Sequence, residues 1–119
     1  MRAMNRDRGT ELARRVERAD RFWKRLRGLS GRRELPRGEA LWIIPCRGVH
    51  TRGMSFPIDV LFLDGECRVL AVEENLAPGR IAPVRWRART VLELPAGTVR
   101  GSDTRIGDHI DFETREETR

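Results

Sequence analysis

The spacing of apolar residues predicts one helix near the start of the chain. These residues step by four, three, four and three positions, which places them on one stripe of an α-helix. Thr10 is a suitable N-cap for this helix, and Gly28 is a suitable residue to end it. The opposite face carries arginines, so the helix is predicted to be amphipathic and to pack on a sheet. The stripe consists of Leu12, Val16, Ala19, Trp23 and Leu26.

The rest of the chain has the short apolar runs of β-strands, separated by turn signals. Asp64-Gly65 is a strong hairpin signal between two of them. One helix followed by such strands indicates an α+β fold with a mostly antiparallel sheet, which we expect to curl into a small barrel-like sheet that hides its edges. The predicted strands are 40–44, 57–63, 67–72, 90–94 and 109–112.

The length of 119 residues accommodates one domain with one hydrophobic core. We expect a flexible basic arm over residues 1–9, a single globular domain over 10–114 and a polar tail over 115–119. No apolar run approaches the roughly 18 residues of a membrane span, and no apolar segment follows the basic N-terminus as it would in a secretory signal. A cytoplasmic location with reduced cysteines is therefore expected.

The formal net charge is +6, from 24 lysines and arginines against 18 acidic residues. All the basic residues except Lys24 are arginines, and they are spread along the whole chain. The aromatic residues, including Trp86, mostly fall in apolar patterns typical of a core, whereas nucleic-acid binders place aromatics within a basic surface. Charge alone supports nonspecific affinity for polyanions, but nucleic-acid binding is not favoured as the function.

The greatest variety of reactive side chains lies in a glycine-rich segment that leads into an apolar strand. It contains the thiol of Cys46, the imidazole of His50 and the carboxylate of Asp59, which is the one charged group at the start of that strand. Asp59 is either a general base or ligand contact, or a structural acceptor of backbone N–H groups from the 48–53 loop. A carboxylate at a strand entry favours the structural role.

Cys46, His50 and Asp59 are also the candidate catalytic residues. A thiolate–imidazole pair oriented by Asp59 would be an activated nucleophile, but Cys46 follows an apolar strand, where a small buried thiol is common. One Cys-x₃-His pair lacks the second ligand pair of a structural zinc site, so no metal and no other cofactor are predicted. A disulfide between Cys46 and Cys67 would require adjacent strands and is disfavoured in the cytoplasm.

A predicted ligand-binding site combines this segment with a later loop. Arg80 follows Pro78-Gly79 in a long exposed connection and can hold a carboxylate or phosphate through two hydrogen bonds. Thr51 and Met54 are expected to line the cavity that the loop encloses. Glu93, between two leucines, is expected to reach solvent or to pair with an arginine. The predicted ligand-binding residues are His50, Thr51, Met54, Asp59 and Arg80.

Five motifs follow one another in a fixed order: RLRGLSGR at 25–32, VHTRGMSFPIDVLFLD at 49–64, PGR at 78–80, VLELPAG at 91–97 and IGD at 106–108. Together they resemble a widespread microbial family known as domain of unknown function number 192. The resemblance extends from about residue 19 to residue 110. It implies a compact, β-rich single domain and no particular activity.

The sequence predicts a noncatalytic binding or accessory module for a small polar or anionic ligand or for a protein partner. No nucleophile–base–oxyanion set, phosphate loop or metal quartet can be assembled from its motifs. Two alternatives stay open. One is a hydrolase or transferase that uses His50 and Asp59, and the other is a module that binds polyanions or proteins through the basic helix.

Overall fold

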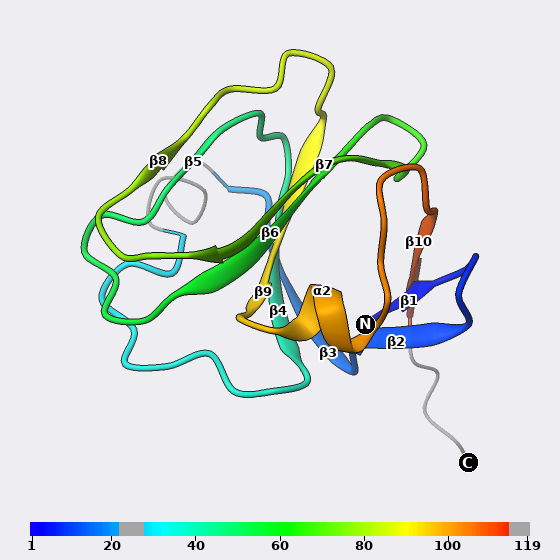
Figure 1. The fold of residues 1–119 in the computed structure, drawn as a ribbon, viewed down its shortest axis with the longest axis horizontal. Helices are drawn as coiled ribbons and strands as arrows, with labels where there is room; N and C mark the ends of the chain where they lie inside the picture. The colour runs from blue at the N-terminus through cyan, green and yellow to red at the C-terminus, as the bar shows by residue number, and fades with distance from the viewer. Residues whose placement is uncertain (22–27, 115–119) are drawn as a thin grey trace.

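The centre of the fold is a five-stranded sheet with a layer of structure on each face (Figure 1). The computed structural model describes residues 1–21 and 28–114. The strands of the central sheet are β3 (Arg15–Ala19), β4 (Glu39–Ile43), β6 (Ile58–Leu63), β7 (Val69–Leu76) and β9 (Thr90–Pro95). They lie in the order β3-β4-β9-β6-β7, and within this sheet β3 and β4 are the parallel pair.

A three-stranded sheet and a short helix cover one face of the central sheet. These elements are β1 (Arg2–Asn5), β2 (Thr10–Ala13), β10 (Ile110–Glu113) and α2 (Thr98–Gly101). β1 lies between β10 and β2 and pairs antiparallel with both. Leu12 and Val99 from this layer pack with Leu61 and Leu92 of the central sheet in one hydrophobic cluster.

The opposite face is covered by loops and by a two-stranded antiparallel ribbon. The ribbon consists of β5 (Val49–His50) and β8 (Ile81–Ala82), and we call it the β5–β8 ribbon. Leu29 and Met54 pack here against Val60 and Phe62 in a second hydrophobic cluster. The β5–β8 ribbon and the three-stranded sheet lie toward opposite ends of the long axis of the molecule (Figure 1).

The predicted α+β class is wrong, because the segment expected to form an N-terminal amphipathic helix contains β2 and β3. Leu12, Val16 and Ala19 are buried as expected. The chain bends at Arg14, whose backbone N–H donates to the carbonyl of Gly38. Because this bend separates two short strands, residues spaced by four and three positions are buried without forming a helix. Positions 23 and 26 of the predicted stripe lie outside the described residues.

The prediction of a barrel-like sheet is also wrong. β3 and β7 are the two edges of the central sheet and do not pair with each other, so the sheet is open. Residues of the layer that contains β1 and β10 form hydrogen bonds with some of the backbone groups on each edge strand. The N–H of Val16 in β3 donates to the carbonyl of Met1, and Val69 in β7 exchanges hydrogen bonds with Gly107 and Asp108, all at 2.8 Å. Edge protection therefore comes from stacking of layers and not from closure.

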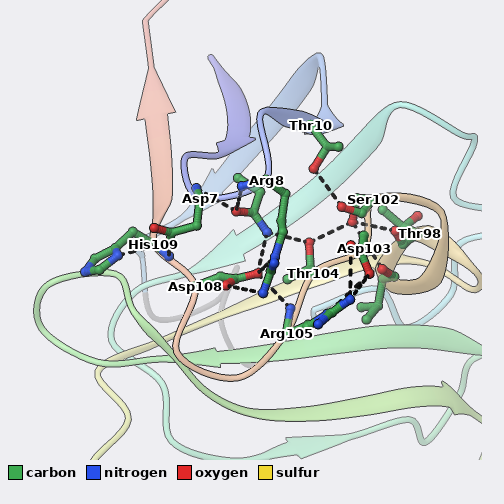
Figure 2. A network of polar contacts seen from close by, with 12 residues as sticks. Asp7, Arg8, Thr10, Thr98, Ser102, Asp103, Thr104, Arg105, Asp108 and His109 are labelled. Atoms are coloured by element: carbon green, nitrogen blue, oxygen red, sulfur yellow. Dashed lines mark hydrogen bonds and ion pairs between the residues drawn. The ribbon is translucent and has the colours of Figure 1, made fainter.

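A buried polar network ties the turn between β1 and β2 to the loop before β10 (Figure 2). Asn5 is fully buried and donates from Nδ2 to Thr104 Oγ1 and to Asp108 Oδ2, both at 3.0 Å. Burial alone would raise the pKa of Asp108, but hydrogen bonds from Asn5, the Arg105 backbone and Arg8 outweigh it and hold that pKa below its usual value. Within residues 1–9, where the sequence suggested a flexible arm, the structure thus places β1 and this turn.

Candidate anion-binding face

Asp59 is a structural hub on the face of the central sheet that α2 covers. Its side chain is fully buried. Oδ1 accepts the N–H of Asn75 at 2.8 Å, and Oδ2 accepts the N–H groups of Gly97 at 3.1 Å and Val99 at 2.9 Å. The donors are backbone groups, as the structural interpretation expected, but they come from β7 and from the start of α2 instead of the 48–53 loop.

His50 lies on the other side of the central sheet from Asp59. Residues alternate along β6, so Asp59 points away from Ile58 and Val60, which pack in the cluster beneath the β5–β8 ribbon. His50 is exposed, and its Nδ1 accepts the backbone N–H of Arg52 at 3.3 Å. The structure therefore does not bring together the imidazole and carboxylate that the hydrolase or transferase alternative needs.

The two cysteines are separate, half-buried and not joined in a disulfide. Cys46 Sγ donates to the carbonyl of Gly48 at 3.0 Å. Burial raises the pKa of the Cys67 thiol. No cluster of three or more His, Cys, Asp and Glu side chains that could hold a metal ion occurs in the described part of the chain. Across the same residues, no helix has the length and apolar character needed to cross a membrane.

Thr51 fastens the β5–β8 ribbon to the turn at Pro78-Gly79. It is fully buried, and its Oγ1 donates to the carbonyl of Ala77 at 2.6 Å while accepting the N–H of Arg80 at 2.8 Å. The N–H of Met54 donates to the Thr51 carbonyl, and the Met54 side chain is buried in the cluster below. Of the predicted ligand-binding residues, the structure groups His50, Thr51, Met54 and Arg80, and places Asp59 elsewhere.

A hollow of about 420 Å³ opens beside the β5–β8 ribbon. Its walls are largely apolar, because Ile81 and Val84 remain 70% and 49% exposed there. A Cβ on Gly48 would lie 3.2 Å from Val84 Cγ2, so the absence of a side chain at Gly48 allows Val84 to approach the ribbon. The lining residues are Gly48, Val49, His50, Arg52, Ile81, Ala82 and Val84.

Arginines flank both ends of this ribbon. Beyond the β5–β8 register, the N–H of Thr51 donates to the carbonyl of Arg80, and the N–H of Arg85 donates to the carbonyl of Arg47. Arg52 and Arg80 therefore follow one end of the ribbon, and Arg47 lies at the other end beside the 85–87 segment. The five Cα–Cα steps from Arg47 to Arg52 could span at most about 17 Å if that segment were fully extended.

Arg85 holds the segment after the ribbon in place. Its guanidinium bonds to Glu73 Oε2 at 2.9 Å and to the Pro83 carbonyl at 2.6 Å, and its Cζ lies 4.7 Å from the centre of the Phe62 ring. The next residue, Trp86, is 79% exposed. The sequence had placed Trp86 among the core aromatics, which is wrong because the Arg85 contacts fix the backbone while the indole remains outside.

The arginines on this side are available for an external partner. Arg47, Arg52, Arg80 and Arg87 are exposed and form no ion pair with any residue that the structure describes. We call the surface formed by Arg47, Arg52, Arg80, Arg87 and Trp86 the basic face.

Two segments account for the whole net charge of the chain. Residues 45–58 and 75–92 contain six arginines and no acidic residue, so the other eighteen basic residues equal the eighteen acidic ones. At the opposite end of the molecule, arginines are neutralised within the chain. The pairs there include Arg2–Glu113 at 2.9 Å, Arg6–Asp111 at 2.7 Å and Arg8–Asp108 at 3.1 Å. The two acid-free segments were the sequence signal for the basic face, and the pairing of β5 with β8 brings them together.

A buried carboxyl group lies on the same side of the central sheet. Glu93 in β9 is 3% exposed, and its Oε1 has no hydrogen-bond partner among the described residues. Burial raises the pKa of Glu93 to about 7, against the opposing effect of the Arg32 charge. Arg32 itself forms an ion pair with Glu17 at 2.7 Å. Glu93 therefore does not reach solvent, and it forms no ion pair with an arginine of the described part of the chain.

The open central sheet with a layer on each face also occurs in two solved structures. A protein of unknown function from Novosphingobium aromaticivorans matches with a TM-score of 0.74 and 23% identity, over 82% of this chain and 74% of that one. A Sinorhizobium meliloti protein named "putative transcription regulator" matches with a TM-score of 0.76 and 25% identity, over 92% and 89%. Both define the class of fold.

The chain belongs to the DUF192 family, described as an uncharacterised ACR, whose model matches residues 3–112. A UPF0127 protein of Thermococcus sibiricus is 31% identical over 119 residues, which cover 96% of this chain and 76% of the relative. A UPF0127 protein of Pyrococcus horikoshii is 36% identical over 101 residues, covering 81% and 85%. The resemblance inferred from the ordered motifs is confirmed.

Proposed function

We propose that this protein is a noncatalytic binding module whose basic face takes an anionic partner. The observation that carries the proposal is the set of four exposed arginines, without ion-pair partners in the described chain, at the two ends of an apolar hollow. Each guanidinium presents a planar fork of donors that suits phosphate or carboxylate oxygens. The local excess of positive charge would also attract an anion from a distance.

Hydrogen bonds hold the backbone that carries these arginines. Thr51 bonds the ribbon to the turn that carries Arg80, and Arg85 bonds the following segment to Glu73. Such preorganisation lowers the entropic cost of binding. The similar Sinorhizobium meliloti protein has a name that refers to transcription regulation, a process carried out on a polyanion, and this agrees with the proposal.

The other two functions considered from the sequence have less support. A hydrolase or transferase would need His50 beside Asp59, whereas Asp59 is engaged by three backbone N–H groups on the opposite face of the sheet. A module that binds through an N-terminal basic helix has no support, because the segment expected to form that helix contains β2 and β3.

The proposal can be tested with two triple variants of equal charge. The first, Arg52→Gln/Arg80→Gln/Arg87→Gln, removes three charges from the basic face. The second, Arg15→Gln/Arg37→Gln/Arg100→Gln, removes three exposed arginines outside the basic face that also form no ion pair within the described residues. Isothermal titration with heparin, a soluble polyanion, should show at least tenfold weaker binding for the first variant and less than about threefold for the second.

Circular dichroism of both variants provides the control for folding. Equal weakening by the two variants would mean that only the net charge matters, and the assignment of the basic face would then be abandoned. Greater weakening by the second variant would move the binding surface to the side of α2.

A further inference from the structure

We infer that the anionic partner of the basic face is a single-stranded nucleic acid, an inference that rests on the function proposed above. The basic face combines four arginines that form no ion pair within the described residues, an exposed indole and an apolar hollow. Proteins that bind single strands use the same combination, in which basic groups follow the phosphates and aromatic rings stack on successive bases.

Trp86 is the observation that separates nucleic acid from other anions. Its 79% exposure is the largest among the large hydrophobic side chains of the described chain, and it immediately precedes Arg87. The three contacts of Arg85 hold the backbone next to it, so the indole is presented outward from a fixed position. A purely acidic chain such as oligoglutamate would pair with the arginines but has no flat group to place against this ring.

The hollow offers a second apolar surface for a base. Its volume of about 420 Å³ falls within the range of small-ligand sites, and Ile81 and Val84 leave much of their side chains open to it. His50 and Arg52 lie at its rim, where an imidazole and a guanidinium can each stack on a base or bond to a phosphate.

The partner is single-stranded because the ring faces of paired bases are covered by their neighbours in a duplex. Stacking on Trp86 and entry into the hollow both need bases that have left a stack. The arginines at the two ends of the ribbon would contact phosphates on either side of these bases. Four arginine–phosphate contacts predict a slope of about −3 for log K against log salt.

The first experiment measures fluorescence anisotropy of a labelled oligothymidine of about twelve nucleotides, a length within the usual site sizes. Three competitors of equal length are titrated against it: an abasic oligomer, a duplex and an oligoglutamate. We expect the oligothymidine to bind at least tenfold more tightly than each competitor, with the salt slope given above.

The second experiment repeats the titration with Trp86→Ala. The loss of one stacked base should weaken oligothymidine binding at least fivefold and leave binding of the abasic oligomer unchanged. Ile106→Ala is the matched control, because Ile106 is 67% exposed but lies outside the basic face in the loop before β10. It should change neither affinity.

The outcomes distinguish this inference from the proposed function. Equal affinity for the oligothymidine, the abasic oligomer and the oligoglutamate, unaffected by Trp86→Ala, would overturn the nucleic-acid inference and leave a general anion-binding face. Preference for the oligoglutamate would assign an acidic polypeptide instead. Failure of every anion to bind, together with failure of the heparin titration, would overturn both.

Discussion

Asp59 and Glu93 show how differently one sheet can treat two buried carboxyl groups. They lie on adjacent antiparallel strands, where Asp59 pairs with Leu94 and Glu93 pairs with Val60, and they point to opposite faces. Asp59 accepts three backbone N–H groups, whereas Glu93 Oε1 accepts none among the described residues. Hydrogen bonds offset the cost of burying a charge, and where they are missing the group retains its proton to higher pH.

Glu93 should make stability fall as pH rises. Burial raises its pKa from 4.5 in the unfolded chain to about 7, so the folded chain binds the proton more tightly. The stabilising effect of protonation is therefore complete below pH 4.5 and is lost as pH rises to about 7, by up to about 3 kcal/mol. Glu93→Gln should remove this dependence, so the variant should match the wild type near pH 4.5 and exceed it in stability at pH 8.

Urea denaturation of both proteins across this pH range checks the prediction, because subtracting the two curves removes the contribution of all other groups. Glu17→Gln is a control on an exposed carboxyl of the same region, and its difference curve should be nearly flat. A Glu93→Gln difference that is constant with pH would show that Glu93 has the same pKa in the folded and the unfolded chain.

α2 illustrates how a short element depends on a side chain that is distant in sequence. The helix has four residues, and its N-cap, Gly97, adopts a left-handed conformation with φ of 95° and offers no side chain for capping. Asp59 of β6 supplies the missing acceptor to the N–H groups of Gly97 and Val99. The same carboxylate bonds to Asn75 at the end of β7, so one residue fixes two elements.

Asp59→Asn should therefore loosen α2 and the end of β7. An amide can keep one acceptor, but its NH₂ group then faces a backbone N–H, which leaves at least one buried donor without a partner. We expect a loss of about 2 kcal/mol in unfolding free energy, measured by urea denaturation. Hydrogen exchange should show faster exchange at Asn75, Gly97 and Val99.

Glu74→Gln is the matched control for this substitution, because Glu74 lines the same surface hollow as Asp59 but is exposed. It should leave stability within about 0.5 kcal/mol of the wild type. Unchanged stability of Asp59→Asn would mean that the carboxylate charge is retained for binding and not for folding.

The elements that sequence analysis identified correctly are those with continuous apolar runs. The predicted strands correspond to β4, β6, β7, β9 and β10, with boundaries that differ by a few residues. The predicted helix is wrong because its apolar spacing also fits two short strands, and partners outside the segment select the strands: Val16 pairs with Ala40, and Ala13 pairs with Ala3. The two-residue strands β5 and β8 are too short to leave any periodic pattern.

At the scale of the whole molecule, charge is distributed unevenly between its two ends. Acidic residues neutralise arginines around β1 and β10, whereas the basic face has no such compensation among the described residues. Like charges held on one surface repel each other, so an unliganded basic face should lower stability slightly.

Arg47→Gln/Arg87→Gln should therefore stabilise the free protein, by about 0.5 kcal/mol at low ionic strength. The gain should disappear in about 1 M salt, where the screening length falls to roughly 3 Å. Arg6→Gln is the opposite control, since it breaks the ion pair with Asp111 and should give no gain. Thermal unfolding at the two salt concentrations measures all three proteins, and a loss of stability in the double variant would show that these arginines make structural contacts.

The candidate site could be predicted only in part, because contacts between distant parts of the chain decide which side chains reach the surface. Of the residues predicted to bind a ligand, Arg80 belongs to the basic face and His50 lines the hollow, whereas Thr51 and Met54 are buried beneath the ribbon. Asp59 was placed with them although alternation along β6 directs it to the other face. The exposure of Trp86 could not be inferred, because it depends on the contacts that Arg85 makes with Glu73 and Phe62 from another part of the chain.

The pairing of the first strand with the last also governs the order in which the chain can fold. Arg2 in β1 bonds to Glu113 in β10, 111 residues further along. Contacts between such distant segments slow folding, because closing a long loop costs conformational entropy before the stabilising contacts form. During synthesis β1 must wait for β10 with one edge unpaired. A chain that terminates before residue 110 would thus expose that edge, the feature that most readily starts aggregation.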